Sequence, residues 1–139
     1  MNLLVTGGSG LVGSAITAEY KPTHDELDLM EFDAIIDYIE ENEITHIIHC
    51  AGLVGGIKAN SEHLGEFFYE NITMNSNLLE AARQCGVEKV VSFMSTCVFP
   101  DDATYPLSPD QIHNGEPHSS NYAYAYAKRM LEVQSRAYR

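Results

Sequence analysis

A glycine-rich turn between a strand-like run and a helix-like run is the feature that most restricts how this chain can fold. Residues 2–6 read as a short buried strand, and Gly7, Gly10 and Gly13 follow it at intervals of three. This spacing permits a tight turn, a close approach of the backbone to a pyrophosphate, and close packing of the helix on the strand. The pattern therefore predicts a dinucleotide-binding turn, formed by Gly7, Gly8, Ser9, Gly10, Leu11, Val12 and Gly13.

Helix-like and strand-like runs alternate along the rest of the chain. We expect helices at about 10–20, 31–41, 71–85 and 121–139, and buried strands at 2–6, 44–50 and 87–94. The second helix is the clearest, because its apolar residues fall at i, i+3, i+4 and i+7: Phe32, Ile35, Ile36 and Ile39. In the third, the residues expected to face inward are Leu78, Leu79 and Ala82, with Gly86 as the stop. The alternation predicts an α/β fold, a Rossmann-like doubly wound parallel sheet with helices on both faces.

The region of the second strand is unusually short. Only fourteen residues separate Gly13 from Asp28, whereas a helix, a strand and two turns need about twenty. We therefore expect the second strand to be abbreviated or missing. The expected last helix also runs to the final residue with no strand after it. We interpret residues 1–139 as part of an NAD(P)-binding domain, from a protein about twice as long whose substrate domain lies outside this chain; a complete minimal domain is the alternative.

Composition limits the classes of partner. The 139 residues carry a formal net charge of −12, which argues against a nucleic-acid surface or an anionic membrane surface. An anionic nucleotide can still bind through backbone N–H groups. No apolar run reaches the roughly 20 residues of a membrane helix. Cys50, Cys85 and Cys97 contain no C-x-x-C pair, so we expect no metal site and free thiols in a reducing cytoplasm.

A tyrosine and a lysine lie four residues apart in the expected last helix. Tyr124 and Lys128 would stack on one helical face, and we expect the ammonium to lower the pKa of the phenol. Tyr122 and Tyr126 have no lysine at this spacing. A chance pair on an exposed helix is the alternative, and the upstream glycine turn and Ser95 weigh against it.

Further candidates follow the strands. Ser95 and Cys97 come just after the strand at 87–94, at the sheet edge where open α/β sheets bind ligands, although each could serve only local structure. Asp28 could face an adenine or belong to an acidic surface. We interpret His46 and His49 as satisfied sheet residues.

Several stretches together resemble the extended short-chain dehydrogenase/reductase family, and within it the epimerase/reductases of GDP-4-keto-6-deoxy-D-mannose. The resemblance covers the whole chain and is carried by residues 5–13, 51–57, 71–80, 95–100, 112–115 and 124–130. The stretch Ser95-Thr-Cys-Val-Phe-Pro100 is the most specific. Dehydratases and 4-epimerases of the family usually carry an acid where this chain has Cys97.

The resemblance implies a role for each candidate. Tyr124 would donate a proton to the sugar oxygen, Ser95 would bind that oxygen, and Cys97 would remove the protons beside the keto group. Lys128 would hold the nicotinamide ribose, and NADPH would deliver hydride. Asn71 would support the catalytic helix. The other cofactor contacts would be Asp28, Leu29, Ala51 and Gly52, with Lys21 and His24 the nearest basic residues for a 2′-phosphate.

The resemblance also implies partners. These are a GDP-sugar substrate and a second copy of the chain, paired through the helices at 71–85 and 121–139, with neither nucleic acid nor membrane. The family's acid partner of the cysteine lies in a Gly-Pro-His stretch that this sequence does not contain. Two other interpretations stay open: a non-catalytic dinucleotide-binding remnant or sensor, and another NAD-dependent nucleotide-sugar epimerase or dehydratase.

Overall fold

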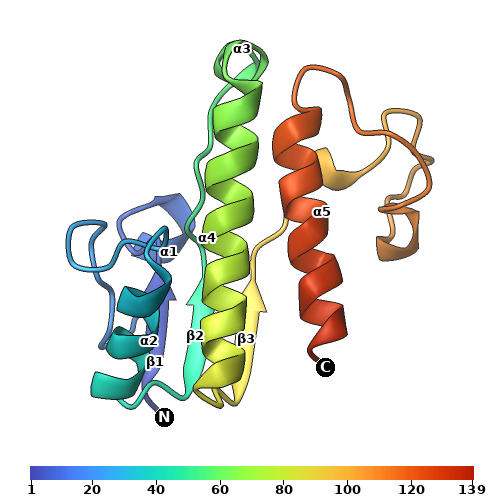
Figure 1. Cartoon of the computed structure of the whole chain (residues 1–139). Helices are drawn as coiled ribbons and strands as arrows, with labels where there is room; N and C mark the ends of the chain where they lie inside the picture. Colours follow the sequence, from blue (N-terminus) through green and yellow to red (C-terminus); the bar gives the residue numbers. More distant parts are fainter. The chain divides into compact units, whose positions relative to one another are not determined.

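The computed structural model describes residues 1–139, and its chain divides into two compact units. The first comprises Met1–Gly52, Thr73–Phe93 and Tyr138, and the second comprises Leu53–Ile72, Met94–Ala137 and Arg139. Figure 1 shows the elements of both units along the chain.

The first unit contains a sheet of three parallel strands. These are β1 (Leu3–Thr6), β2 (His46–His49) and β3 (Lys89–Ser92), in the order β1-β2-β3. Val5 lies opposite Ile48, which lies opposite Val91. Helix α2 (Phe32–Glu41) lies between β1 and β2 in the chain, and α4 (Leu64–Gln84) precedes β3 (Figure 1). The expected α/β fold with a parallel sheet is confirmed.

The expected second strand is reduced to a single residue. Tyr20 forms an isolated parallel bridge with Leu4, and the Val5 N–H donates to the Tyr20 carbonyl at 2.9 Å. The abbreviated second strand is therefore confirmed. The helix expected at 10–20 is wrong, because α1 covers only Leu11–Ser14. The chain has to return to β1 at Tyr20, and Pro22 disfavours helical backbone in the residue before it.

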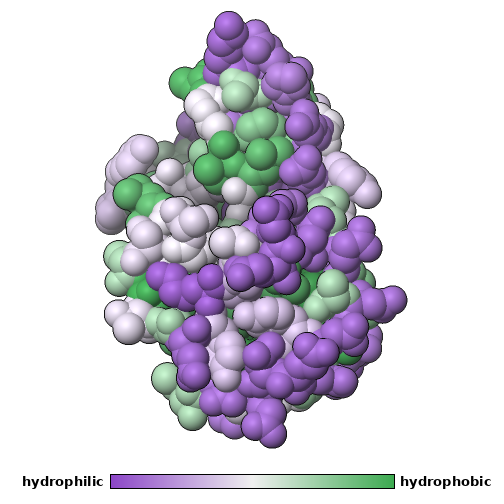
Figure 2. Space-filling model, turned by 90° about the vertical axis from the view of Figure 1, so that its left-hand side faces the viewer, coloured by the Kyte–Doolittle hydropathy of each residue, from purple (hydrophilic) through white to green (hydrophobic).

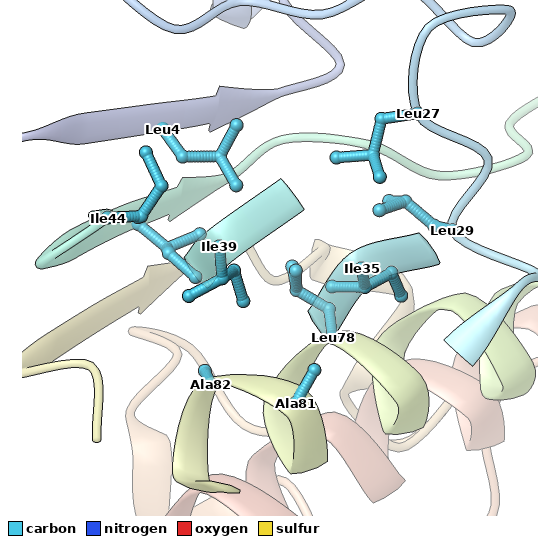
Figure 3. Packing of buried hydrophobic residues seen from close by; sticks show 10 residues of the cluster. Leu4, Leu27, Leu29, Ile35, Ile39, Ile44, Leu78, Ala81 and Ala82 are labelled. Atoms are coloured by element: carbon cyan, nitrogen blue, oxygen red, sulfur yellow. The ribbon is translucent and has the colours of Figure 1, made fainter. Parts of the chain in front are cut away.

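The core of the first unit joins β1 and β2 to α2 and α4. The side chains of Ile35 and Ile39 from α2 meet Leu78 from α4 beside Leu4 (Figure 3). Leu27 and Leu29, from the segment before α2, complete the same cluster. The inward positions predicted for both helices are confirmed, because Leu78, Leu79 and Ala82 are also buried.

The helix boundaries differ from expectation mainly around α4. Helix α2 begins one residue later than expected, whereas α4 begins at Leu64, well before Asn71. A short helix that was not expected, α3 (Ile57–Glu62), precedes it. The predicted stop at Gly86 is confirmed, since this residue adopts φ +69° two positions after the helix ends.

The last strand is less buried than expected. Lys89 and Val91 of β3 are exposed, as are Phe93 and Met94 just beyond it. The expectation of a fully buried strand at 87–94 is therefore wrong. The reason is that β3 stands at the end of the strand order, with β2 as its one neighbour.

The second unit holds α3, the start of α4, the 3₁₀ turns η1 (Thr96–Val98) and η2 (Pro109–Gln111), and helix α5 (Tyr122–Ala137). Arg129 of α5 is only 3% exposed. Its Nε donates to the Val98 carbonyl and its Nη1 to the Gly115 carbonyl, both at 2.8 Å. Arg129 thus ties the irregular segment 98–118 to α5.

Figure 2 shows how hydrophilic and hydrophobic residues are distributed on one face. Hydrophilic residues cover most of the face shown in Figure 2, with smaller groups of hydrophobic residues between them. None of the helices has both the length and the apolar character that a membrane span requires.

Candidate functional site

The glycine turn packs directly on the segment that follows β2. Gly7 adopts φ +68°, and a Cβ atom there would lie 2.6 Å from the Ala51 nitrogen. A side chain at this position would therefore be strained and would also collide with backbone. The contact places the start of the turn against Ala51, so two parts of the predicted cofactor site meet in the first unit.

The later glycines close the turn onto α1. The Gly10 N–H donates to the Gly7 carbonyl at 3.0 Å, and a Cβ on Gly13 would overlap that same carbonyl oxygen. Ser9, Gly10, Leu11 and Val12 remain exposed. The turn thus has no room for side chains on its inner side, and it offers its outer backbone to a ligand.

The residues proposed for the adenine side lie in the same unit. One carboxylate oxygen of Asp28 accepts from the Met30 N–H at 2.9 Å, and the other lies 3.9 Å from His24 Nε2. The Leu29 side chain belongs to the hydrophobic core, and its carbonyl accepts from Asn77 Nδ2 at 3.2 Å. Asp28 therefore has a local structural task, whatever its role toward a ligand.

The two sheet histidines are satisfied by hydrogen bonds, as predicted. His46 Nδ1 lies 2.9 Å from Thr45 Oγ1. His49 is fully buried, with Nδ1 2.7 Å from Thr6 Oγ1 and Nε2 2.9 Å from Asn75 Oδ1. Because a carbonyl oxygen can only accept, Nε2 donates to Asn75, and in a neutral imidazole Nδ1 then accepts from the Thr6 hydroxyl.

In the second unit the structure brings together Ser95, Cys97 and Tyr124. Ser95 caps η1, where its Oγ accepts from the Cys97 N–H at 3.3 Å. The Ser95 side chain also hydrogen-bonds the Tyr124 phenol, and Cys97 is close enough to act electrostatically on that phenol. Three of the four predicted catalytic residues therefore form one cluster.

The pKa of Tyr124 is shifted in the direction opposite to our expectation. Burial raises it above its ordinary value of 10, and the hydrogen bond from Ser95, which lowers it, does not offset this effect. The thiol of Cys97 adds a smaller raising effect. The expected net lowering of the Tyr124 pKa is therefore wrong for this structure, because burial has the largest effect. A phenol with a raised pKa carries its proton at neutral pH but is a weaker acid than an unshifted phenol.

This shift predicts a late titration of one phenol. The near-ultraviolet absorbance of phenolate is titrated against pH in the wild-type protein and in Tyr124→Phe, and the second curve is subtracted from the first. The difference should rise with a midpoint above pH 10, because burial disfavours the phenolate. Tyr38, whose pKa burial also raises, is present in both proteins and cancels. A midpoint at or below 10 would show that Tyr124 is acidified after all.

Lys128 lies on α5 one turn after Tyr124 and is 4% exposed. A lysine that is buried loses hydration of its ammonium group and depends on nearby acceptors. The structure thus assigns Lys128 to the interior of the second unit. This excludes the alternative of a chance Tyr-x-x-x-Lys pair on an exposed helix face.

Asn71 has a different task from the one implied by resemblance. Its Nδ2 donates to the carbonyls of Leu53 at 2.9 Å and Phe67 at 2.7 Å, and its Oδ1 accepts from the Leu53 N–H at 3.1 Å. These bonds hold the segment after Gly52, whereas support of α5 was expected. Asn71 is fully buried, so the amide fixes this segment firmly.

A pocket of about 230 Å³ opens beside Cys97, within the second unit. Cys97 and Asn121 line it, together with Asp101, Tyr105 and His118 from the segment after η1. The Asn121 side chain donates from Nδ2 to Cys97 Sγ at 3.1 Å. Sequence reasoning missed Asn121 and Arg129, because their partners lie in an irregular segment whose path no periodic pattern predicts.

The chain is similar to known proteins along its whole length. The model of the NAD dependent epimerase/dehydratase family matches residues 3–139. The chain is 46% identical to a GDP-L-fucose synthase of Dictyostelium discoideum and 42% identical to a probable GDP-L-fucose synthase of Drosophila melanogaster. Both alignments cover 98% of this chain but 46% of the relative, so the chain spans just under half the length of either.

The fold comparison agrees. The crystal structure of a GDP-L-fucose synthetase from Naegleria fowleri bound to NADP matches with a TM-score of 0.87 and 40% identity, covering 98% of this chain and 44% of that one. The parallel sheet, the glycine turn and the cluster of Ser95, Cys97 and Tyr124 agree with the family match. The chain belongs to the NAD dependent epimerase/dehydratase family.

Proposed function

We propose that this chain is the cofactor-binding portion of an NADPH-dependent GDP-L-fucose synthase, which converts GDP-4-keto-6-deoxy-D-mannose to GDP-L-fucose. The observation that carries the proposal is the grouping of Ser95, Cys97 and Tyr124 in the second unit. Ser95 hydrogen-bonds both the backbone of Cys97 and the phenol of Tyr124. A thiol and a protonated phenol placed in this way suit epimerisation beside a carbonyl, followed by reduction of that carbonyl. The names of the relatives support the same substrate.

The glycine turn fits a dinucleotide. Side chains at Gly7 and Gly13 would fill its inner space, while Ser9 and Gly10 leave backbone exposed. NADPH, when bound, would supply hydride to the keto carbon. We propose that the cofactor is held by Gly7, Gly8, Ser9, Gly10, Leu11, Val12, Gly13, Asp28, Leu29, Ala51 and Gly52, with Lys128 at the ribose.

The catalytic roles follow from the chemistry of each group. The thiolate of Cys97 takes a carbon-bound proton beside the keto group, and Tyr124 donates a proton to the C4 oxygen as reduction proceeds. Ser95 hydrogen-bonds Tyr124 and offers its hydroxyl to the same oxygen. Burial raises the pKa of the Tyr124 phenol, so the group carries the proton that it donates.

Lys21 is our candidate for reading the 2′-phosphate of NADPH. Its Nζ donates to the Ile16 carbonyl at 2.9 Å, and a Cβ built on Gly8 would lie 3.0 Å from Lys21 Cε, so the side chain runs beside the glycine turn. Lys21→Ala should weaken NADPH binding about tenfold and leave NADH binding unchanged, since one charge contact is lost. Fluorescence titration of both cofactors measures this, with Lys89→Ala on the exposed face of β3 as control. Equal weakening for NADH would remove Lys21 from this role.

The proposal is tested by turnover. The chain joined to the C-terminal part of the Dictyostelium discoideum relative, given GDP-4-keto-6-deoxy-D-mannose and NADPH, should form GDP-L-fucose. The 139-residue chain alone should form none, because it spans under half of such an enzyme. Absence of GDP-L-fucose from a folded, NADPH-binding chimera would end the proposal.

A non-catalytic dinucleotide-binding module is the second candidate. The observation that favours it is the short span of the chain relative to its relatives. On this interpretation the isolated chain binds NADPH without turnover, and the chimera is inactive as well. A nucleotide-sugar dehydratase or 4-epimerase, the third candidate, would retain tightly bound NAD on purification.

We further propose that the active protein is a homodimer paired through α4 and α5, and that it works in the cytoplasm. Met130 and Val133 on α5 are partly exposed apolar residues, which suits a helix that contacts a partner. The three free cysteines suit a reducing compartment.

A further inference from the structure

Asn121, which no motif identified, is placed directly against the sulfur of Cys97. It precedes α5, and its carbonyl accepts from the Ala125 N–H at 3.0 Å, which anchors its backbone at the start of the helix. Its side-chain Nδ2 donates to Cys97 Sγ at 3.1 Å, while its Oδ1 is buried and has no partner. The hydrogen bond to sulfur is therefore the one polar contact that orients this amide.

Cys97 is thus held at two points. The backbone of Cys97 is fixed by the Ser95 hydroxyl at 3.3 Å, and its sulfur is fixed by the Asn121 amide. An amide N–H is a neutral donor whose strength does not change with pH. A hydrogen bond that ends on a charged acceptor is stronger than one that ends on a neutral acceptor. The contact consequently stabilises the thiolate more than the thiol.

Other titratable groups lie near Cys97 in the second unit. Tyr124 approaches from α5, with Lys128 buried one turn later, and Asp101, Tyr105 and His118 line the same pocket. Asp101 opposes a thiolate and a protonated His118 favours it, so their contributions change with pH. Asn121 differs from all of them, because it donates at every pH.

We propose that Asn121 is a positioning residue for Cys97, whose amide holds the sulfur and stabilises the thiolate form. The significance of this for epimerisation rests on the proposed function, in which Cys97 removes protons beside the keto group. The effect on the thiol itself does not depend on any substrate.

The test is the rate at which iodoacetamide alkylates Cys97 as a function of pH, resolved from Cys50 and Cys85 by peptide mass spectrometry. The full 139-residue chain is used, without cofactor or substrate. Asn121→Ala should slow alkylation of Cys97 about tenfold at neutral pH and move the half-maximal rate to higher pH, as expected for a lost hydrogen bond to a charged group. Asn121→Asp keeps the side-chain shape and cannot donate when ionised, so it should slow the reaction at least as much. Asn114→Ala, an exposed amide in segment 98–118, should change nothing.

The direction of the change separates loss of the hydrogen bond from unfolding. Unfolding would speed alkylation of all three cysteines, whereas the proposal requires slower alkylation of Cys97 alone. If Asn121→Ala unfolds, the isosteric Asn121→Asp decides the matter. Unchanged or faster alkylation of Cys97 in folded Asn121→Asp would overturn the proposal. The proposed function would survive that result, because turnover of the sugar by the chimera is measured separately.

Discussion

Replacing Cys97 by serine should abolish the exchange of sugar protons with solvent while leaving ketoreduction largely in place. A serine hydroxyl is a much weaker acid than a thiol, so it supplies almost no base at neutral pH. General base catalysis contributes roughly 10²–10⁴ in rate, and we expect a loss of this order. The measurement is deuterium uptake at C3 and C5 of GDP-4-keto-6-deoxy-D-mannose in heavy water, with the chimeric enzyme and no NADPH.

Two variants make this experiment specific. Cys85→Ser applies the same chemical change to a partly buried thiol packed against the core of the first unit, and it should leave exchange intact. Tyr124→Phe should show the opposite pattern to Cys97→Ser, with exchange retained and NADPH consumption lost. Loss of both activities to the same extent in Cys97→Ser would contradict the separate roles of the two residues.

Replacing Gly7 by alanine should destabilise the first unit by roughly 2–5 kcal/mol. Two effects add: the left-handed backbone at φ +68° disfavours a side chain, and the new Cβ would lie 2.6 Å from the Ala51 nitrogen. The colliding atom is backbone at the end of β2, so it cannot rotate away. Urea denaturation monitored by circular dichroism gives the change in the free energy of unfolding.

Gly86→Ala is the matched control. Gly86 has nearly the same backbone angle, φ +69°, but a Cβ there would meet no atom within 4 Å. It should cost only the conformational strain, about 1–2 kcal/mol. The difference between the two variants isolates the close approach of the turn to Ala51. Equal destabilisation would mean that this contact does not restrict the sequence at position 7.

Periodic patterns predicted the first unit well. The apolar residues at i, i+3, i+4 and i+7 in α2 and on one face of α4 predicted the buried side of each helix. Ile35, Ile39 and Leu78 are buried together in the core, as this pattern requires. The pattern failed where tertiary contacts override it. Helix α1 ends at Ser14 because the chain must return to pair Tyr20 with Leu4, which no local preference indicates.

The sequence predicted which residues form the candidate site, but it did not predict the contacts between them. Ser95 and Cys97 follow a strand end and Tyr124 starts a helix, so their types and order suggested a site. Spacing along the chain could not give the sign of the Tyr124 pKa shift, because burial, which dominates it, depends on the whole second unit. Asn121 and Arg129 were missed for the same reason. Asn121 bonds Cys97, 24 positions earlier in the chain, and Arg129 bonds Val98 and Gly115.

The single bridge at Tyr20 has a consequence for engineering. Only one residue between α1 and Leu27 takes part in the sheet, through the Val5 N–H to Tyr20 carbonyl bond of 2.9 Å. We therefore expect that the length of segment 22–26, after Lys21, can change without altering the register of β1, β2 and β3. We also expect that a longer segment grafted from a relative at this point would extend the sheet outward beside β1, where its effect on cofactor preference can be measured.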